Sequence, residues 1–217
     1  MLEGFLERIY PFLSEILDEN GIALRRKRFF YLVGDIREGG GFYSERMNAF
    51  LEWLLVDMDS QLDGDSLLSV ILREKRGLLD DETRLMAEAM LKSRRSLFLI
   101  VRKEKEFAVL EDIFDGERFY IDPDPRIEIS EKKSLVETRV FLLRGRSRIM
   151  STYLRYPDRL KKIIIKQLKR LSKGGGVDKD KFLDYSMALY IRSERYRKVP
   201  IEKIADSLNY LLYGQSV

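Results

Sequence analysis

The sequence predicts an α+β protein with a helical N-terminal region, a small antiparallel β-barrel or bent sheet, and C-terminal helices. Two observations lead to this expectation. Apolar residues recur at helical spacing before residue 96 and after residue 155, whereas residues 96–155 hold short apolar runs separated by turn residues. Five short, evenly spaced strands are typical of a small barrel of the SH3-like or OB-like kind. With 217 residues, 45% of them hydrophobic, the chain can bury a substantial core.

The N-terminal region, residues 1–95, is expected to form a series of core helices. Pro11 interrupts the first apolar stripe and should kink that helix or begin a second one, and Gly21 is expected to end it. Mostly apolar residues at helical spacing within residues 22–37 share one helical face, although residues 29–33 also fit a strand. We favour the helix, because the flanking sequence is helical.

Glycines at position 34 and at 39–41 have the spacing of a phosphate-binding loop, but the residues that such a loop needs are missing. The loop requires a lysine and then a serine or threonine directly after its last glycine, to reach the phosphates and magnesium. Phe42 and Tyr43 occupy those positions. We therefore predict a flexible connection rather than a nucleotide site.

Further core helices are expected between this connection and the strands. Ser44 is a suitable N-cap for the first of them, and Asp80 for the last. Four carboxylates that could hold magnesium or calcium lie close together in one loop between these two N-caps: Asp57, Asp59, Asp63 and Asp65. Their spacing misses the calcium-loop pattern, so we expect them to cap helices and to solvate the loop.

The strands of residues 96–155 are separated by clear turn signals. Asp115-Gly116 predicts a hairpin, because a type I′ turn needs positive φ at both central positions. Pro123 and Pro125 place a loop after the third strand, and Arg144-Gly145-Arg146 forms a hairpin loop between the last two. The apolar runs assigned to strands cover residues 97–101, 107–114, 118–121, 136–143 and 147–154.

Residues 156–173 predict an amphipathic helix with one apolar and one basic face. Pro157 suits a first helical turn, and Asp158 beside it favours the positive end of the helix dipole. Such a helix could lie along a phosphate backbone, an anionic membrane or an acidic protein, or it could dock and expose lysines to solvent.

The glycines at 174–176 mark a linker, after which residues 177–217 are expected to form a helical hairpin. Residues 199–209 resemble the first half of a helix-turn-helix, but a recognition helix is missing, because Tyr210 to Tyr213 continue the same helix. A hairpin that packs on the body or on a partner is the favoured interpretation.

Positive charge is concentrated in the last part of the chain. Residues 155–217 contain 15 basic and 7 acidic residues, an excess of +8, whereas the chain as a whole carries +4. Such asymmetry suits an acidic partner, although it can also reflect complementary charges within one fold. The candidate basic binding face consists of Arg144, Arg146, Arg148, Arg159, Lys162, Lys166, Lys169, Arg170 and Lys173.

Four segments, residues 50–57, 79–84, 93–98 and 110–119, resemble the body of uncharacterised bacterial proteins that often carry a zinc-binding SEC-C motif. The shared positions serve packing and turns rather than chemistry. A SEC-C tail needs cysteine and histidine ligands, and this chain contains neither. Zinc binding is therefore not implied for this chain.

The composition removes most familiar catalytic constellations. Without cysteine there is no disulfide, thiolate nucleophile or thiolate metal site, and without histidine the commonest general base and metal ligand is missing. We expect no enzymatic activity and no cofactor. The sequence shows no secretion signal, and no stretch approaches the ~18 apolar residues of a membrane span, so a cytoplasmic location is expected.

These observations predict a non-catalytic binding or adaptor module with a protein partner. The alternative is a nucleic-acid-binding protein that uses the basic C-terminal region and the small β-domain. A continuous basic stripe from Arg144, Arg146 and Arg148 to the lysines of residues 156–173 would favour nucleic acid. An exposed apolar groove between the terminal helices would favour a protein.

Overall fold

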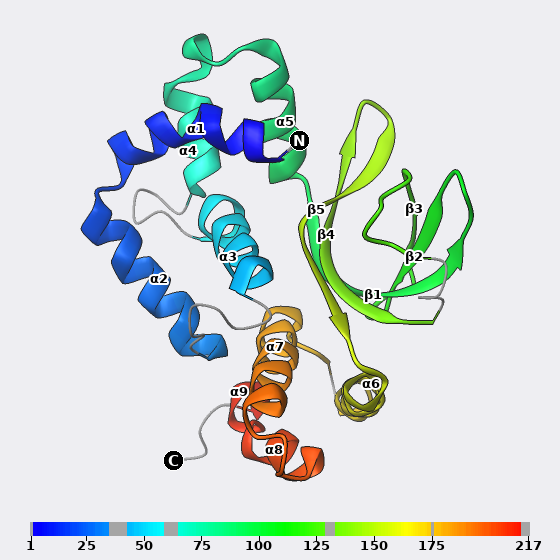
Figure 1. The fold of residues 1–217 in the computed structure, drawn as a ribbon. Coiled ribbons are helices and arrows are strands. Elements are labelled where there is room, and N and C mark those ends of the chain that lie inside the picture. Colours follow the sequence, from blue (N-terminus) through cyan, green and yellow to red (C-terminus); the bar gives the residue numbers. More distant parts are fainter. Residues whose placement is uncertain (1, 35–42, 59–64, 129–132, 175, 214–217) are drawn as a thin grey trace.

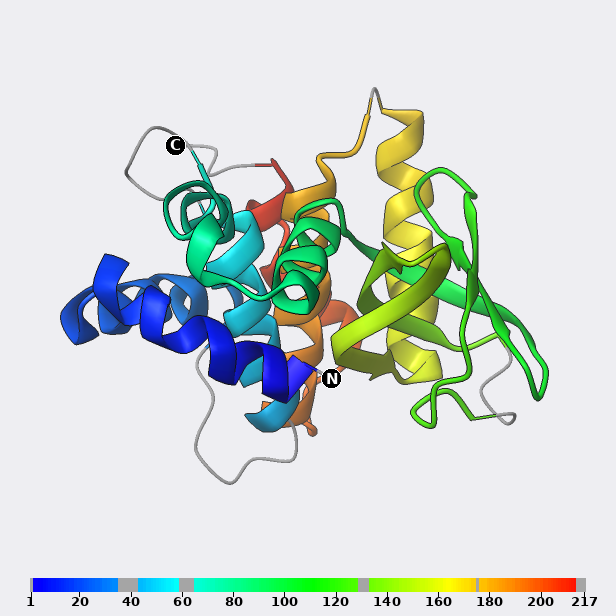
Figure 2. The same cartoon turned by 90° about the horizontal axis from the view of Figure 1, so that it is seen from above.

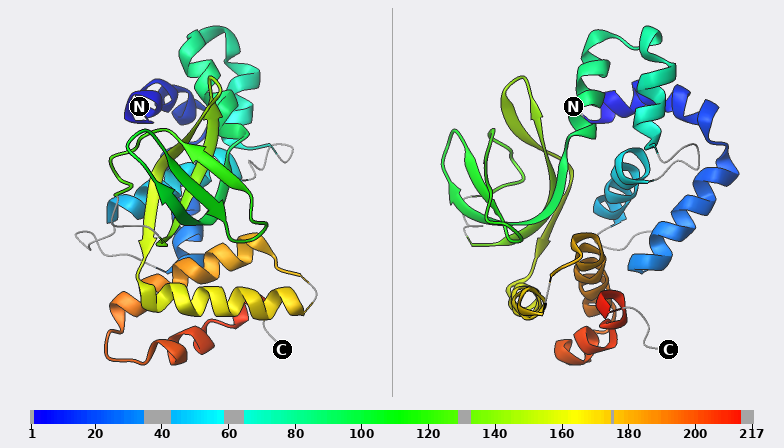
Figure 3. Two further views of the ribbon diagram at one scale, coloured as in Figure 1. Left: turned by 90° about the vertical axis from the view of Figure 1, so that its right-hand side faces the viewer. Right: turned by 180° about the vertical axis from the view of Figure 1, so that it is seen from behind.

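The computed structural model describes residues 2–34, 43–58, 65–128, 133–174 and 176–213, and it confirms an α+β fold with a small barrel (Figure 1). A layer of helices lies along one side of the barrel (Figure 2). Helix α6 (Asp158–Lys173) crosses one end of the barrel (Figure 3). The glycines at 39–41 and two of the clustered aspartates, Asp59 and Asp63, lie outside the described residues.

Five strands close the barrel in the order β1-β2-β3-β5-β4. The strand bounds are Arg94–Lys103 for β1, Ala108–Asp112 for β2, Arg118–Ile121 for β3, Leu135–Leu143 for β4 and Arg146–Tyr156 for β5. All neighbours are antiparallel except β3 and β5, which are parallel at Ile121 and Ser147. This Greek-key order is that of the OB-fold rather than of a sequential meander, so it decides between the two kinds of barrel expected.

The barrel has its own small core, because alternate residues of each strand point inward. Its inward residues include Phe98, Ile100, Leu110, Ile121, Val136 and Val140. The outward residues of β4 are also buried, as are those of β5 from Met150 onward, because the helical layer covers that side of the barrel. Both faces of β4 are therefore inaccessible to water over most of its length.

The helical layer precedes and follows the barrel in the sequence. Before the barrel lie α1 (Leu2–Ile16), α2 (Glu19–Val33), α3 (Tyr43–Glu52), the π-helix η1 (Trp53–Asp57), α4 (Leu67–Glu74), the 3-10 helix η2 (Arg76–Leu78) and α5 (Asp81–Leu91). After α6 come α7 (Lys179–Arg195), α8 (Ile201–Ser207) and α9 (Tyr210–Tyr213). Buried residues of helices before the barrel and of helices after α6 belong to one shared core.

The structure confirms a helix rather than a strand within residues 22–37, and it corrects the expected role of Gly21. The first helix ends at Ile16 and runs through Pro11 without a second helix beginning there. Gly21 lies in the first turn of α2, where its N–H donates to the Asp18 side chain at 2.7 Å. The N-cap of the new helix, rather than a glycine stop, therefore divides α1 from α2.

Two predicted turns differ in detail. The connection from β2 to β3 is wider than a two-residue turn, and only Gly116 in it has positive φ. The Asp112 side chain accepts a hydrogen bond from the Phe114 N–H at 2.9 Å, so the loop begins directly at the end of β2. Near the end of the described chain, Leu208 and Asn209 form a turn, so residues 210–213 form a separate short helix.

Candidate functional site

An exposed aromatic side chain marks the outer face of strand β3. Along β3, Phe119 and Ile121 point toward the barrel interior, so Arg118 and Tyr120 point outward. Tyr120 is 65% exposed, and its ring centroid lies 6.0 Å from that of Phe107 in the β1–β2 connection. We call the region formed by Phe107, Arg118, Tyr120 and Arg146 the β3 surface.

The β3 surface contains a hollow that lies between the β1–β2 connection and the β4–β5 turn. A pocket of about 470 Å³ is lined by these four residues together with Asp122, Gly145 and neighbouring positions of β3 and β5. The hydrogen bond from Asp122 N to Ser147 O, 2.9 Å long, fixes the end of β3 beside the start of β5. Barrel closure thus brings Arg146 next to an aromatic pair that is about 25 to 40 residues away in the sequence.

The arginines on and beside this surface are exposed, and each forms an ion pair with one carboxylate. Arg118 Nε lies 2.7 Å from Glu111, and Arg146 Nη1 lies 3.9 Å from Asp122. Arg102 pairs with Glu104 at 2.8 Å, and its guanidinium lies 5.3 Å from the centre of the Phe107 ring. Exposed pairs of this kind contribute little to stability. These cations can therefore change partner at low cost.

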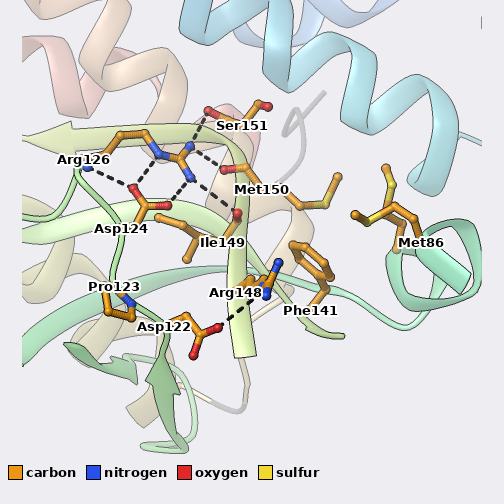
Figure 4. Close-up of a pocket in the computed structure, with 11 residues that line it drawn as sticks. Met86, Asp122, Pro123, Asp124, Arg126, Phe141, Arg148, Ile149, Met150 and Ser151 are labelled. Carbon is orange, nitrogen blue, oxygen red and sulfur yellow. Dashed lines mark hydrogen bonds and ion pairs between the residues drawn. The ribbon is translucent and has the colours of Figure 1, made fainter. Parts of the chain in front are cut away.

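A second pocket of about 540 Å³ adjoins the β3 surface, because Asp122 lines both hollows. Figure 4 shows its apolar wall, formed by Met86 of α5, Phe141 of β4 and Met150 of β5, opposite a polar wall. In the polar wall, Arg148 Nε lies 3.4 Å from Asp122. The two pockets thus share a charged residue, Asp122, and each combines charged groups with aromatic or apolar side chains.

Arg126 in the polar wall has a structural role. It donates to both carboxylate oxygens of Asp124, at 2.9 and 2.7 Å, and to backbone carbonyls of β5 (Figure 4). Burial would raise the pKa of Asp124, but the hydrogen bonds from Arg126 hold it below its ordinary value. The pair therefore stays ionised and ties the β3–β4 connection to β5.

The structure divides the candidate basic face between two ends of the barrel. Arg144 and Arg146 lie at the β4–β5 turn, at the opposite end from α6 (Figure 1). The 11-residue strand β5 separates that turn from α6, which corresponds to about 30 Å. Arg146 and the lysines Lys162, Lys166 and Lys169 consequently line different hollows of the protein.

The remaining members of the candidate face lie on α6. Arg159 pairs with Glu194 of α7 at 3.3 Å, so it helps to dock the helix. Lys162, Lys166 and Lys169 line a groove between α6 and β1. Arg170 and Lys173 are exposed in the last turn of α6 and line none of the pockets described for this structure. The predicted apolar face of the helix is confirmed, since Leu160, Ile164 and Leu168 are buried.

A buried polar layer between the barrel and the helices was not predicted. Its members are Arg46, Glu52, Arg95, Glu137, Arg139, Tyr156 and Asp184. Glu137 is 0% exposed and accepts hydrogen bonds from Arg95 Nη2 and from the Tyr156 hydroxyl, each at 2.7 Å. Glu52 accepts from the Thr152 N–H at 2.7 Å. The sequence signal was the presence of Glu137 and Arg139 on one face of an otherwise apolar strand.

Burial shifts the pKa values of this layer. It raises the pKa of Glu52, against the opposing effects of the Thr152 N–H and Arg139, and it raises the pKa of Asp184 to about 6. It lowers the pKa of Arg46 to about 10. Arg46 donates to the Gly34 carbonyl at 2.9 Å, and its guanidinium lies 5.3 Å from the ring centres of both Phe29 and Phe30. None of the pockets described for this structure opens onto the layer, so we assign it a structural role.

Comparison with known proteins places most of the chain in one family. A model described as a family of unknown function, DUF7986, matches residues 40–188. The chain belongs to the DUF7986 family. No curated protein and no solved structure matches the chain. The kinship with SEC-C proteins stays a prediction.

The DUF7986 segment runs from the residues before α3 into α7, so it contains the whole barrel, both pockets beside β3 and the α6 groove. Within the described part of this segment and its flanks, no group of three or more acidic residues is arranged to hold a metal ion. Asp57 pairs with Arg139, and Asp65 pairs with Arg73. Among the described helices, none is both long and apolar enough to cross a membrane.

Proposed function

We propose that this DUF7986 protein is a non-catalytic module that binds single-stranded nucleic acid on the β3 surface. The observation that carries the proposal is Tyr120, a large aromatic side chain that is 65% exposed on a rigid strand. Phe107 beside it extends the aromatic area. Aromatic side chains stack on bases of any sequence, with about 1–3 kcal/mol for each stacked base.

The surrounding charges suit a phosphate backbone. Arg118 and Arg146 flank Tyr120 in the pocket on the β3 surface, and both guanidinium groups are exposed, each beside one half-buried carboxylate. A phosphate can replace a carboxylate as the partner of a planar guanidinium, since both accept two hydrogen bonds from it. Binding should therefore release salt counterions and weaken with ionic strength.

The strand order supplies a second argument, by analogy with other OB-fold barrels. OB-fold barrels bind oligonucleotides and oligosaccharides with the face of their second and third strands and with the loops that join strands one to two and four to five. Phe107 lies in the first of these loops, Tyr120 on the third strand and Arg146 directly after the second loop. The basic and aromatic composition favours nucleic acid over a neutral sugar.

A catalytic role has less support. In the pocket beside α5, the potential acid–base and anion-binding groups are already engaged, since Arg126 holds Asp124 and Arg148 approaches Asp122. The protein has no histidine or cysteine to act as a general base or nucleophile at neutral pH.

The test is fluorescence anisotropy with labelled single-stranded DNA and RNA over a salt series, with duplexes of the same sequence for comparison. Tyr120→Ala should weaken binding to single strands by about tenfold or more. Tyr31→Ala is the matched control, because Tyr31 is 88% exposed on α2, away from the barrel. Arg118→Glu with Arg146→Glu should weaken binding further and reduce its salt dependence.

The proposal fails if wild-type protein does not bind single strands at low salt, or if Tyr120→Ala and Tyr31→Ala bind equally well. It also fails if only substitutions on α6 affect binding, because the nucleic acid would then lie on the other end of the barrel.

A further inference from the structure

A groove between helix α6 and strand β1 combines an apolar floor with a cationic wall. Its volume is about 630 Å³. The floor is formed by Leu99, Ile100 and Val101 of β1 and by Ile165 of α6. The walls carry five lysines: Lys133, Lys161, Lys162, Lys166 and Lys169. We call this feature the α6 groove.

The sequence of α6 explains this arrangement. Leu160, Ile164 and Leu168 face the core, so Ile165 and the lysines at 162, 166 and 169 lie on the adjacent side of the helix, next to β1. These three lysines are spaced four and three residues apart and form a row about 10 Å long. A ligand with more than one negative charge along this distance would therefore complement the row.

The lysines differ in their availability. Lys161 lies 2.6 Å from Asp158 and donates to the Lys133 carbonyl at 3.0 Å, so it is partly engaged. Lys162, Lys166 and Lys169 form no ion pair with any acidic residue in the described parts of the chain. Three adjacent ammonium groups repel one another, and an anionic ligand would relieve this repulsion.

We infer that the α6 groove docks an acidic amphipathic segment of a partner protein. Its apolar side chains would cover Leu99, Val101 and Ile165, and its carboxylates would meet the lysine row. A fatty acid carries a single charge at one end and would leave most of the row unpaired. A nucleic-acid strand fits less well, since the residues that line the groove include no aromatic side chain on which a base could stack.

This inference is independent of the proposed nucleic-acid function. The α6 groove and the β3 surface lie at opposite ends of the barrel, and no residue lines both hollows (Figure 1). One site can therefore fail its test while the other passes.

The test measures binding of a short fluorescein-labelled peptide made of leucine and glutamate at helical amphipathic spacing. Lys162→Glu with Lys166→Glu should weaken binding by about tenfold or more. Arg170→Glu with Lys173→Glu is the matched control, because it makes the same charge change on the same helix outside the groove. The control should change the affinity by less than about twofold.

Two further measurements separate docking from simple charge attraction. Ile165→Ser shortens a half-buried floor residue without changing charge, and it should weaken peptide binding by about fivefold. The same peptide with glutamine in place of glutamate should bind at least about tenfold more weakly. Circular dichroism of each variant checks that the fold is retained.

The inference is overturned if both double variants lose affinity equally, because net charge would then explain binding. It is also overturned if an oligothymidylate or phosphatidylglycerol vesicles bind wild-type protein through Lys162 and Lys166 more tightly than the peptide does.

Discussion

Glu137 is fully buried on the outward face of β4, yet both of its carboxylate oxygens accept hydrogen bonds. A buried ion pair gains little over well-packed apolar residues, but the loss of one partner leaves an uncompensated charge. Burial would lower the pKa of Arg95, but Glu137 raises it above its ordinary value. Glu137, Arg95 and Tyr156 therefore act together to fix how the barrel lies against the helices.

Tyr156→Phe tests this arrangement, since it removes only the hydroxyl that donates to Glu137 at 2.7 Å. We expect the free energy of unfolding to fall by about 1.5–3 kcal/mol, the range for hydrogen bonds to charged groups. Urea denaturation measures the change. Tyr120→Phe, which removes an exposed hydroxyl, should have almost no effect. An equally small effect at Tyr156 would contradict the assigned role.

Asp184→Asn tests the electrostatics of the same layer. Burial raises the pKa of Asp184 to about 6, so between its unfolded pKa and that value the folded state binds more protons than the unfolded state. Stability should consequently fall as the pH rises from about 4 to about 6. An asparagine amide at this position does not titrate, so it adds no pH dependence. The free energy of unfolding of the variant minus that of wild type should therefore be about 1–2 kcal/mol more favourable at pH 7 than at pH 4.

Urea denaturation at both pH values measures this difference. Glu202→Gln, at an exposed position of α8, controls for the removal of one acidic charge. The interpretation is wrong if Asp184→Asn is less stable than wild type by the same amount at both pH values.

At the scale of elements, the β4–β5 turn shows how local chemistry sets up the β3 surface. Arg144 and Gly145 both have positive φ, 51° and 75°, which is the type I′ pattern that matches the twist of a hairpin. The turn thereby fixes the register that places Arg146 opposite Leu143. Arg144 is one of two non-glycine residues with positive φ among those described, so the position carries some strain.

Gly145→Ala should destabilise the protein by about 1 kcal/mol, because the added Cβ meets no neighbouring atom and only the backbone conformation is penalised. Arg144→Asn should stabilise it by a few tenths of a kcal/mol, since asparagine tolerates this conformation better. Thermal and urea unfolding measure both changes. Gly77→Ala is the control, because Gly77 also has open space around it but no positive φ. Equal costs at Gly145 and Gly77 would contradict the argument.

At the scale of the whole molecule, one large core joins segments from both ends of the chain. It contains Phe5 of α1 and Phe50 of α3 together with Leu189 of α7 and Leu154 of β5. The chain enters the helical layer, leaves it for the barrel and returns through α7, which packs against α2. The two ends should therefore unfold together rather than as separate domains.

Leu189→Ala tests this unity, because Leu189 is fully buried in α7. We expect a loss of about 2–5 kcal/mol, the range for large-to-small substitutions in a core. Fluorescence of Trp53 reports on the helical layer, and hydrogen exchange of the amides of β4 reports on the barrel. Both should lose stability by the same amount. Protection of β4 that survives after the Trp53 signal has changed would show that the barrel folds independently.

The sequence by itself determined the local elements of this protein. Short apolar runs between turn residues predicted the strands, helical spacing predicted the apolar face of α6, and Gly145 predicted the last hairpin, because each depends on neighbours within a few residues. Arg146 was also named from the sequence as a binding candidate, because it is one of the arginines of the candidate basic face. The wider β2–β3 loop was not predicted, because it depends on how the Asp112 side chain folds back onto the backbone.

Only the tertiary structure decided which residues meet. Barrel closure places Tyr120 next to Arg146 and separates both from the lysines of α6, which composition alone had grouped into one basic face. The same closure turns Glu137 and Arg139 toward the helices rather than toward water. These outcomes follow from strand order and from the side of the barrel that the helices cover, and such long-range pairings leave no periodic signal in the chain.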